Sequence, residues 1–349
     1  MINVEIICTP FGQTADGQSV EQYTLTDGAC RADILTLGGI IRTLIVPDQH
    51  GVPIDVVLGF DSVRAYEAQS CYIGALLGRC AGRIAAGCIA ITGQEYHLSC
   101  NEKGINHLHG GCVGLDKRIW RAKVEADRLL LHYDSPAGEE GYPGHLSGTV
   151  AYSLRDGSLA LDYSAKADAD TVCNLSSHAY FNLAGHDAGE VGEQLLCVHA
   201  GRYTPLGAYS APDGTIASVN GTPLDLRIPR PMADGWDSGF DQIRRAGGYD
   251  HNYIIEGEGM RPVAVVYCVQ TGIQLTLRSD MPGVQVYSGN SIGSDPPRGK
   301  GGAVYGKRHG FCLETQFWPN AFACPGFPLP ILRVGEIWHH RTEYVFSTR

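Results

Sequence analysis

Short stretches in which apolar and polar residues alternate recur along most of the chain. In the clearest of them, residues 150–165, alternate positions are apolar on both sides of the dipeptide Asp156-Gly157. Side chains of a β-strand point to opposite faces in turn, so this period of two predicts strands with one buried face. An Asp-Gly dipeptide between two such runs predicts a tight β-hairpin.

The same pattern recurs elsewhere, always beside turn residues. Alternating runs follow Thr271-Gly272 and Pro282-Gly283, and further pairs flank Thr92-Gly93 and residues 46–51. Apolar residues at helical spacing are rare, and the best helix candidate is the short segment 62–69. The pattern therefore predicts an all-β protein, an antiparallel sandwich or barrel. Because glycine is spread evenly and no linker interrupts the pattern, we expect one domain over residues 1–349.

Composition and charge disfavour nucleic acids and membranes as partners of this protein. The chain is 44% hydrophobic and 18% charged, which suits a globular protein with a sizeable core. Its formal net charge is -10 and its 27 Lys and Arg do not cluster, so we expect no nucleic-acid partner. No run approaches the roughly 20 apolar residues of a membrane span, and the first residues lack a basic leader. These features favour a cytoplasmic protein without a membrane partner.

Motifs for metals and cofactors are weak. The 12 cysteines form no C-x-x-C pair, which favours buried thiols in a reducing compartment over a zinc site or a disulfide framework. Gly299-Lys300 resembles a phosphate loop, but Gly301 stands where a hydroxyl residue is needed. His107 and His109 are suitably spaced on a strand to share a metal, yet no third ligand follows at a familiar spacing. We therefore predict no metal and no cofactor.

Four segments carry most of the chemistry: residues 106–111, 177–183, 249–253 and 310–319. They combine histidines, amides, aromatic rings and isolated carboxylates, a composition suited to sugar binding. Two glycines after His109 would let the backbone approach a ligand closely. Each segment also has a structural explanation: Asp250 can close a turn, and Glu314 on a strand can point to solvent. On these grounds alone the prediction is an all-β protein with a polar cleft.

The order of these segments resembles the aldose 1-epimerase (galactose mutarotase) family over nearly the whole chain. Residues 78–84 resemble the family's G-R-x-x-N-R-I, residues 108–111 match L-H-G-G, and residues 178–183 match most of N-H-S-Y-F-N-L. Further matching segments lie at residues 139–144, 222–225, 283–287 and 311–316. The resemblance implies a large antiparallel β-sandwich, the galactose mutarotase-like supersandwich. It also implies an enzyme that interconverts the α and β anomers of free aldoses such as galactose and glucose.

The resemblance also assigns roles to residues. The residue matching Glu314 is the general base, the one matching His178 is the general acid, and His109 supports the reacting oxygens. The sugar hydroxyls are bound by the positions matching Arg83, Asp250 and Gln285, with Gly82 beside them. Opening a sugar ring requires the C1 hydroxyl to lose a proton while the ring oxygen gains one, and a carboxylate with a histidine can do both.

The sequence departs from the family pattern at two positions near the expected cleft. Gly82 and Ser177 stand where the family usually has Asn. Both replacements are smaller, so we expect a roomier and less polar subsite that discriminates weakly among aldoses.

Three other functions remain open at this stage. The chain could be an epimerase of a pentose or of a phosphorylated hexose, although a phosphate would call for extra cations. It could be a sugar-binding protein without activity, although Glu314 and His178 are both retained. A glycosidase needs two carboxylates, which Glu314 and Asp250 could supply. The oligomeric state, monomer or homodimer, is not decided by the sequence.

Overall fold

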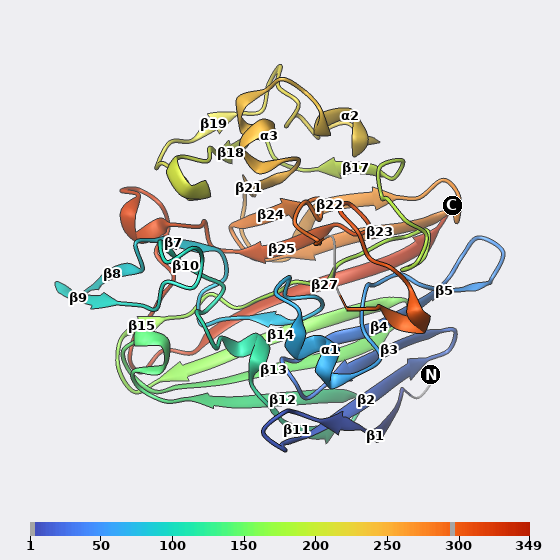
Figure 1. Cartoon of the computed structure of the whole chain (residues 1–349), viewed down its shortest axis with the longest axis horizontal. Helices are drawn as coiled ribbons and strands as arrows, with labels where there is room; N and C mark the ends of the chain where they lie inside the picture. Colours follow the sequence, from blue (N-terminus) through green and yellow to red (C-terminus); the bar gives the residue numbers. More distant parts are fainter. Residues whose placement is uncertain (1–3, 294–296) are drawn as a thin grey trace.

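The computed structural model describes residues 4–293 and 297–349, and antiparallel β-sheets dominate it. The largest sheet has nine strands in the order β11-β12-β13-β14-β27-β23-β22-β17-β20. Two five-stranded sheets accompany it, β1-β2-β3-β4-β5 and β19-β18-β21-β24-β25. In Figure 1 the long strands β12, β13, β14 and β27 cross the lower half of the molecule, and β21, β24 and β25 lie above them.

The strands and helices have the following bounds. The nine-stranded sheet contains β11 (Arg121–Glu125), β12 (Arg128–Ser135), β13 (Leu146–Arg155), β14 (Ser158–Ala167), β27 (Trp338–Thr348), β23 (Ile273–Ser279), β22 (Arg261–Tyr267), β17 (Leu195–Val198) and β20 (Arg230–Pro231). The five-stranded sheets contain β1 (Glu5–Gln13), β2 (Ser19–Asp27), β3 (Cys30–Leu35), β4 (Ile41–Pro47) and β5 (Pro53–Asp55), and β19 (Ala217–Ser218), β18 (Arg202–Thr204), β21 (Asp250–Ile254), β24 (Gly283–Tyr287) and β25 (Cys312–Gln316). Two-stranded pairs are formed by β6 (Leu76–Leu77) with β16 (Ser176–Ser177), β7 (Arg83–Ala85) with β10 (Asn106–Leu108), β8 (Cys88–Ile91) with β9 (Gln94–His97), and β15 (Thr171–Val172) with β26 (Ile331–Leu332). The α-helices are α1 (Val63–Ala68), α2 (Ala233–Trp236) and α3 (Asp241–Ala246).

The local predictions are confirmed where the pattern was clearest. β13 and β14 pair through ten residues around the turn at Asp156-Gly157, and both turn residues have positive φ, 51° and 73°. Positive φ at both central positions is what a two-residue hairpin turn requires. The predicted helix is α1, which begins after Ser62, whose side chain accepts a hydrogen bond from the backbone N–H of Ala65.

A large apolar cluster lies between the sheets. The cluster includes Leu25 and Leu44 from the sheet β1-β5 and Val150 and Leu161 from the nine-stranded sheet. It also includes Leu313 from the sheet that contains β25. Residues from all three sheets thus share one cluster, as the faces of a sandwich do. The predicted all-β antiparallel sandwich is confirmed.

One sequence-based expectation, the burial of the cysteines, needs adjustment. All 12 cysteines are free thiols, but only seven are buried, and Cys8 and Cys112 are exposed. The expectation of buried thiols is therefore wrong for those two positions and for the three half-buried ones. Within the described residues, no helix is long and apolar enough to cross a membrane.

Candidate active site

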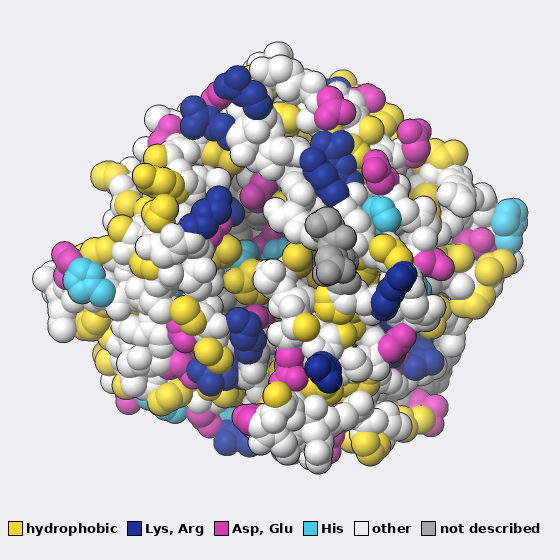
Figure 2. Space-filling model, viewed as in Figure 1, with side chains coloured by type: hydrophobic (Ala, Val, Ile, Leu, Met, Phe, Trp, Pro, Cys, Tyr) yellow, Lys and Arg dark blue, Asp and Glu magenta, His cyan; other side chains and the backbone are white. Residues whose placement is uncertain are grey.

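A cleft of about 410 Å³ opens in the face of the molecule drawn in Figure 2, where histidine and acidic side chains are visible in the hollow near the centre. Its volume lies in the usual range for small-molecule sites, roughly 300–1,000 Å³. All seven residues that the sequence assigned to the site line it. They are Gly82, Arg83, His109, His178, Asp250, Gln285 and Glu314.

Strand register explains how the floor of the cleft is assembled. In the sheet β21-β24-β25, Glu314 lies opposite Gln285, and Gln285 lies opposite Asn252. Directly opposed residues of neighbouring strands point to the same face. One row of polar side chains therefore faces the cleft, while the intervening residues Leu313 and Val286 face the apolar core.

Glu314 is almost completely buried at the centre of this row, with an exposed fraction of 2%. Its Oε2 atom has no hydrogen-bond partner among the described residues. Burial, followed by the nearby Asp250 carboxylate, raises the pKa of Glu314 well above its usual value, and Arg83 opposes this only in part. The carboxyl is thus poised to hold a proton.

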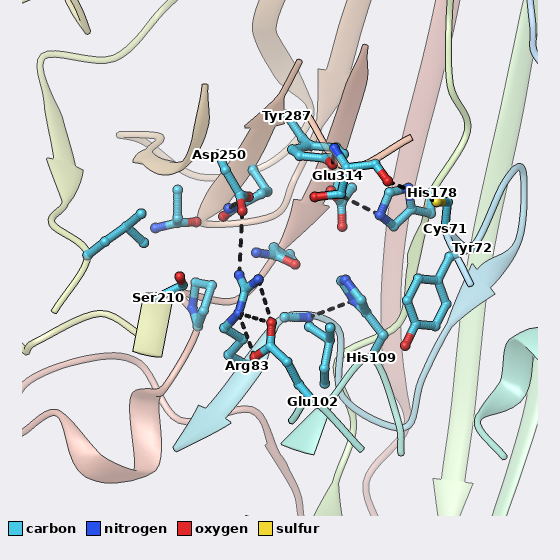
Figure 3. A pocket seen from close by; sticks show the side chains of 18 of the residues that line it. Cys71, Tyr72, Arg83, Glu102, His109, His178, Ser210, Asp250, Tyr287 and Glu314 are labelled. Carbon is cyan, nitrogen blue, oxygen red and sulfur yellow. Dashed lines mark hydrogen bonds and ion pairs between the residues drawn. The ribbon is translucent and has the colours of Figure 1, made fainter. Parts of the chain in front are cut away.

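His178 lies beside Glu314 in the cleft, and its Nε2 atom lies 3.8 Å from Glu314 Oε1 (Figure 3). Its backbone N–H donates to the carbonyl of Ala75 at 2.8 Å, which fixes the chain at this point. The rings of Tyr180 and Tyr72 lie nearly parallel to the imidazole, at 4.9 and 5.8 Å between centroids. Burial among these rings lowers the pKa of His178 to about 4.

His109 is the third member of the cluster, and a backbone hydrogen bond fixes its tautomer. The N–H of Gly82 donates to His109 Nδ1 at 3.2 Å. Because Nδ1 accepts this bond, the proton of the neutral ring lies on Nε2. Burial, followed by the neighbouring His178, lowers the pKa of His109 well below its usual value. His109 is therefore a neutral N–H donor, suited to stabilising an oxygen that becomes more negative.

A second polar group lies beside the acid–base pair. The guanidinium of Arg83 donates to the carboxylate of Glu102 at 2.9–3.1 Å, and its other side lies 3.6 Å from Asp250 (Figure 3). Asp250 also accepts a hydrogen bond from Gln285 Nε2 at 2.6 Å. These contacts hold each side chain in one orientation, as recognition of several hydroxyls requires.

The two histidines of the sequence pair His107 and His109 do not form a metal site. Both ring nitrogens of His107 are occupied, Nδ1 by the carbonyl of Ser99 at 2.7 Å and Nε2 by the hydroxyl of Tyr142 at 2.5 Å. His109 instead groups with His178 and Glu314, whose potential ligand atoms lie within 4.8 Å of one another. This set has the ligand types that zinc accepts. The spacing of these three residues in the sequence did not predict that they lie together.

Several structural findings were not expected from the sequence. Ser177 is buried, pairs with Leu76 in a short sheet and does not line the cleft, so its small size cannot widen a subsite. Gly110 and Gly111 make room for the protein itself: a Cβ at these positions would lie 1.7 Å from the Gly78 carbonyl oxygen and 2.2 Å from Glu140 Oε2. The packing of the protein thus accounts for both glycines, and neither lines the cleft.

The sequence also missed part of the lining. Glu102, which holds Arg83, lies in a segment without strand periodicity, and the contact spans 19 residues of chain. Tyr72, Tyr180 and Tyr287 form aromatic walls, and Asn252 and Gln316 lie in the polar floor. The last two belong to the segments 249–253 and 310–319 that the sequence singled out, and each lies two residues from Asp250 or Glu314, on the same face of its strand.

Comparison with known proteins agrees with the geometry. A family model described as aldose 1-epimerase matches residues 21–345. The chain is 40% identical to a galactose mutarotase from Homo sapiens over 97% of both chains, and 33% identical to an aldose 1-epimerase from Escherichia coli over 95% of this chain and 96% of the other. A crystal structure of a galactose 1-epimerase from Lactobacillus acidophilus superposes with a TM-score of 0.85, at 24% identity and 99% coverage of both chains. The chain therefore belongs to the aldose 1-epimerase family.

Proposed function

We propose that this protein is an aldose 1-epimerase, a mutarotase that interconverts the α and β anomers of free aldoses such as galactose and glucose. The observation that carries the proposal is the pairing of Glu314 with His178 across 3.8 Å at the bottom of a sugar-sized cleft. Residues between 70 and 319 line this cleft, and one apolar cluster includes residues from Leu25 to Phe346. We therefore infer that the whole chain acts as one functional domain.

Glu314 takes the proton of the C1 hydroxyl while His178 gives a proton to the ring oxygen. The C1–O5 bond breaks, the C1–C2 bond rotates, and the ring closes on the other face of C1 with the two proton transfers reversed. His109 donates its Nε2–H to the reacting oxygens. Arg83, Asp250 and Gln285 bind the remaining hydroxyls, with Gly82 beside them in the cleft wall. Each positioned acid or base typically contributes about 10²–10⁴-fold to the rate.

The protons of this reaction balance within the pair. Burial raises the pKa of Glu314 and lowers that of His178, so the pair holds one shared proton over a wide pH range. Ring opening converts a carboxylate and an imidazolium into a carboxylic acid and an imidazole, and ring closure restores the first arrangement. Since the total number of protons does not change, no proton has to be exchanged with water during a turnover.

The competing functions are less well supported by the site. Among the described lining residues the only cations are Arg83 and Lys103, and Arg83 already faces two carboxylates, which disfavours a phosphorylated sugar. Asp250 is held by Arg83 and Gln285, which disfavours it as the second carboxylate of a glycosidase. A protein that only binds sugar has no use for a buried carboxyl facing a buried imidazole.

Polarimetry on freshly dissolved α-anomers, with methyl galactoside as a comparison substrate, tests the proposal. Free aldoses should reach anomeric equilibrium faster with the protein, and methyl galactoside should remain unchanged because it has no anomeric hydroxyl. Release of methanol would indicate a glycosidase. Binding of sugar without any acceleration would contradict the proposal. Activity should survive exhaustive dialysis against a chelator, whereas loss and recovery with zinc would assign His109, His178 and Glu314 as metal ligands.

We also propose a broad substrate range. This proposal depends on Gly82, because Ser177 does not line the cleft. Gly82 lines the cleft with a φ of 76° and offers no side-chain amide to a sugar hydroxyl, while a Cβ at this position would lie 3.1 Å from Pro319 Cγ. We expect comparable rates for galactose, glucose and at least one pentose. A preference for galactose over glucose above about a hundredfold, near the upper range for one apolar contact, would contradict this expectation.

A further inference from the structure

The two histidines of the cleft differ in the partner that holds Nδ1. A backbone N–H donates to Nδ1 of His109, whereas Nδ1 of His178 lies 3.3 Å from the Sγ atom of Cys312. Cys312 has an exposed fraction of 0%, and its thiol lies against the His178 ring. Nothing in the proposed reaction has yet used this thiol.

The proposed acid role of His178 decides the direction of this contact. The Nε2 atom faces Glu314 and the cleft, so Nε2 is the nitrogen that gives its proton to the sugar. The ring can release that proton and become neutral only if Nδ1 keeps its own proton. Nδ1 therefore has to be a donor, and the sulfur of Cys312 is a side-chain acceptor within reach, at 3.3 Å.

We propose that Cys312 is a positioning residue for the acid–base pair, because its sulfur accepts the Nδ1–H of His178 and thereby leaves Nε2 free to exchange the catalytic proton. His109 and His178 then carry opposite tautomers in their neutral forms. His109 has its proton on Nε2 and only donates, whereas His178 has its proton on Nδ1 and can both accept and give at Nε2. The different tautomers of His109 and His178 thus follow from the backbone amide of Gly82 and the thiol of Cys312.

The backbone around Cys312 supports this role. Phe311 and Phe181 exchange two backbone hydrogen bonds, at 2.8 and 3.0 Å, which tie the segment after His178 to the start of β25. Cys312 and Glu314 are two residues apart on β25 and face the same side. One strand therefore carries both the base and the group that orients the acid. Sulfur is a weak acceptor, so it fixes the ring without strongly stabilising the imidazolium.

The most direct test is the ¹⁵N NMR spectrum of protein labelled at histidine, with His178 assigned by comparison with the His178→Asn variant. The expected neutral form of His178 has its proton on Nδ1, while His109 has its proton on Nε2. A spectrum in which neutral His178 carries its proton on Nε2 would overturn the proposal. This wild-type measurement decides the question even if a variant at Cys312 does not fold.

Kinetics of three variants separate positioning from packing. Cys312→Ser retains an acceptor and should keep most of kcat, whereas Cys312→Ala leaves a buried donor unpaired and should lower kcat roughly tenfold or more with little change in KM. Cys173→Ala is the matched control, because Cys173 is equally buried, belongs to the large apolar cluster, and among the described residues has no hydrogen bond from its thiol to a histidine. Equal effects of Cys312→Ala and Cys173→Ala would overturn the proposal.

The inference rests on the proposed function, and the two can fail separately. If the wild-type protein does not accelerate mutarotation of any aldose, the proposed function is wrong whatever the NMR spectrum shows. If mutarotation is observed but His178 is the Nε2–H tautomer, or Cys312→Ala keeps the wild-type kcat, the proposed function stands and the role of Cys312 is wrong.

Discussion

The hairpin β13–β14 and the paired strands β24–β25 share the same antiparallel geometry but differ in whether their polar side chains are exposed to solvent or buried. In β13 and β14 buried and more exposed positions largely alternate, so one face packs on the core and the other meets solvent. In β24 and β25 all ten residues are buried. One face of these strands packs on the core, and the other face forms the floor of the cleft.

The second region contains polar atoms that the fold does not satisfy. Within the described residues, Asn252 Oδ1, Gln285 Oε1, Glu314 Oε2 and both amide atoms of Gln316 are buried without a partner. Each such atom costs about 1–3 kcal/mol of stability. A cluster of them on one sheet face indicates that a ligand supplies the missing partners, because proteins depart from local packing rules mainly at functional sites. The contrast teaches that the cleft strands are shaped for a ligand and the hairpin for stability.

The largest expected effect comes from removing the acid together with the base. His178→Asn should lower kcat about 10²–10⁴-fold, because Asn cannot give a proton to the ring oxygen. The double variant Glu314→Gln/His178→Asn should be little worse than either single variant, since groups that act as a unit are not additive. Polarimetry of α-galactose measures all three rates. Fully multiplicative losses would show that the two residues act independently.

The pH profile of kcat/KM should reflect the shared proton. As the pH falls through about 4, His178 gains a proton while Glu314 is already protonated, so the pair cannot accept one and the rate should fall. At the alkaline end Glu314 loses its proton, the pair has none to give, and the rate should fall again. The expected bell therefore has an acid limb near 4 and an alkaline limb well above 4.5. Because buffer also catalyses mutarotation, the spontaneous rate is subtracted at every pH. An acid limb at 6.5, the ordinary value for histidine, would contradict the account.

A smaller effect is expected from the outer polar group. Asp250→Ala removes a partner from both Arg83 and Gln285, so sugar binding should weaken as well as the rate. Loss of a hydrogen bond to a charged group is expected to cost about 1.5–3 kcal/mol, or roughly 10–150-fold in kcat/KM. Steady-state kinetics separates KM from kcat. An unchanged KM would place Asp250 outside the binding site.

The hairpin should show the opposite behaviour, an effect on stability without an effect on activity. Gly157→Ala adds a Cβ at a φ of 73°, where it would lie 3.2 Å from the Phe346 carbonyl oxygen. Left-handed backbone costs an ordinary residue about 1–2 kcal/mol, so thermal denaturation should shift down by a few degrees. The kcat for α-galactose should not change. A fall in kcat of the folded variant would show that the hairpin contributes to the cleft.

The sequence predicted these two regions with different success, for a physical reason. Alternation with a period of two is longest where one strand face meets solvent, so it revealed the hairpin at Asp156-Gly157 and its register. In the cleft only β24 was predicted from alternation, after Pro282-Gly283, whereas β21 and β25 were recognised through the motifs around Asp250 and Glu314.

What the sequence could not reveal depends on contacts between distant segments. The pairing of Arg83 with Glu102, the grouping of His109 with His178 and Glu314, and the contact of Cys312 with His178 all join separate elements. The direction of a side chain in a very short strand was equally hidden, so Ser177 was expected near the cleft and lies in the core. Such features appear only when the register of several sheets is known.

The most direct test of the central claim, that Glu314 is the base of a mutarotase, is the pair of kcat and sugar affinity measured for Glu314→Gln. The amide keeps the shape of the side chain but cannot accept the proton. Asp162→Asn serves as the control, because it also replaces a carboxylate by the amide of the same size. Asp162 lies on β14, where it pairs with Arg341. The account predicts that Glu314→Gln binds galactose almost normally and has lost nearly all mutarotation, whereas Asp162→Asn is unchanged in both. A folded Glu314→Gln protein that retained most of its kcat would contradict the account, because another residue would then have to be the base.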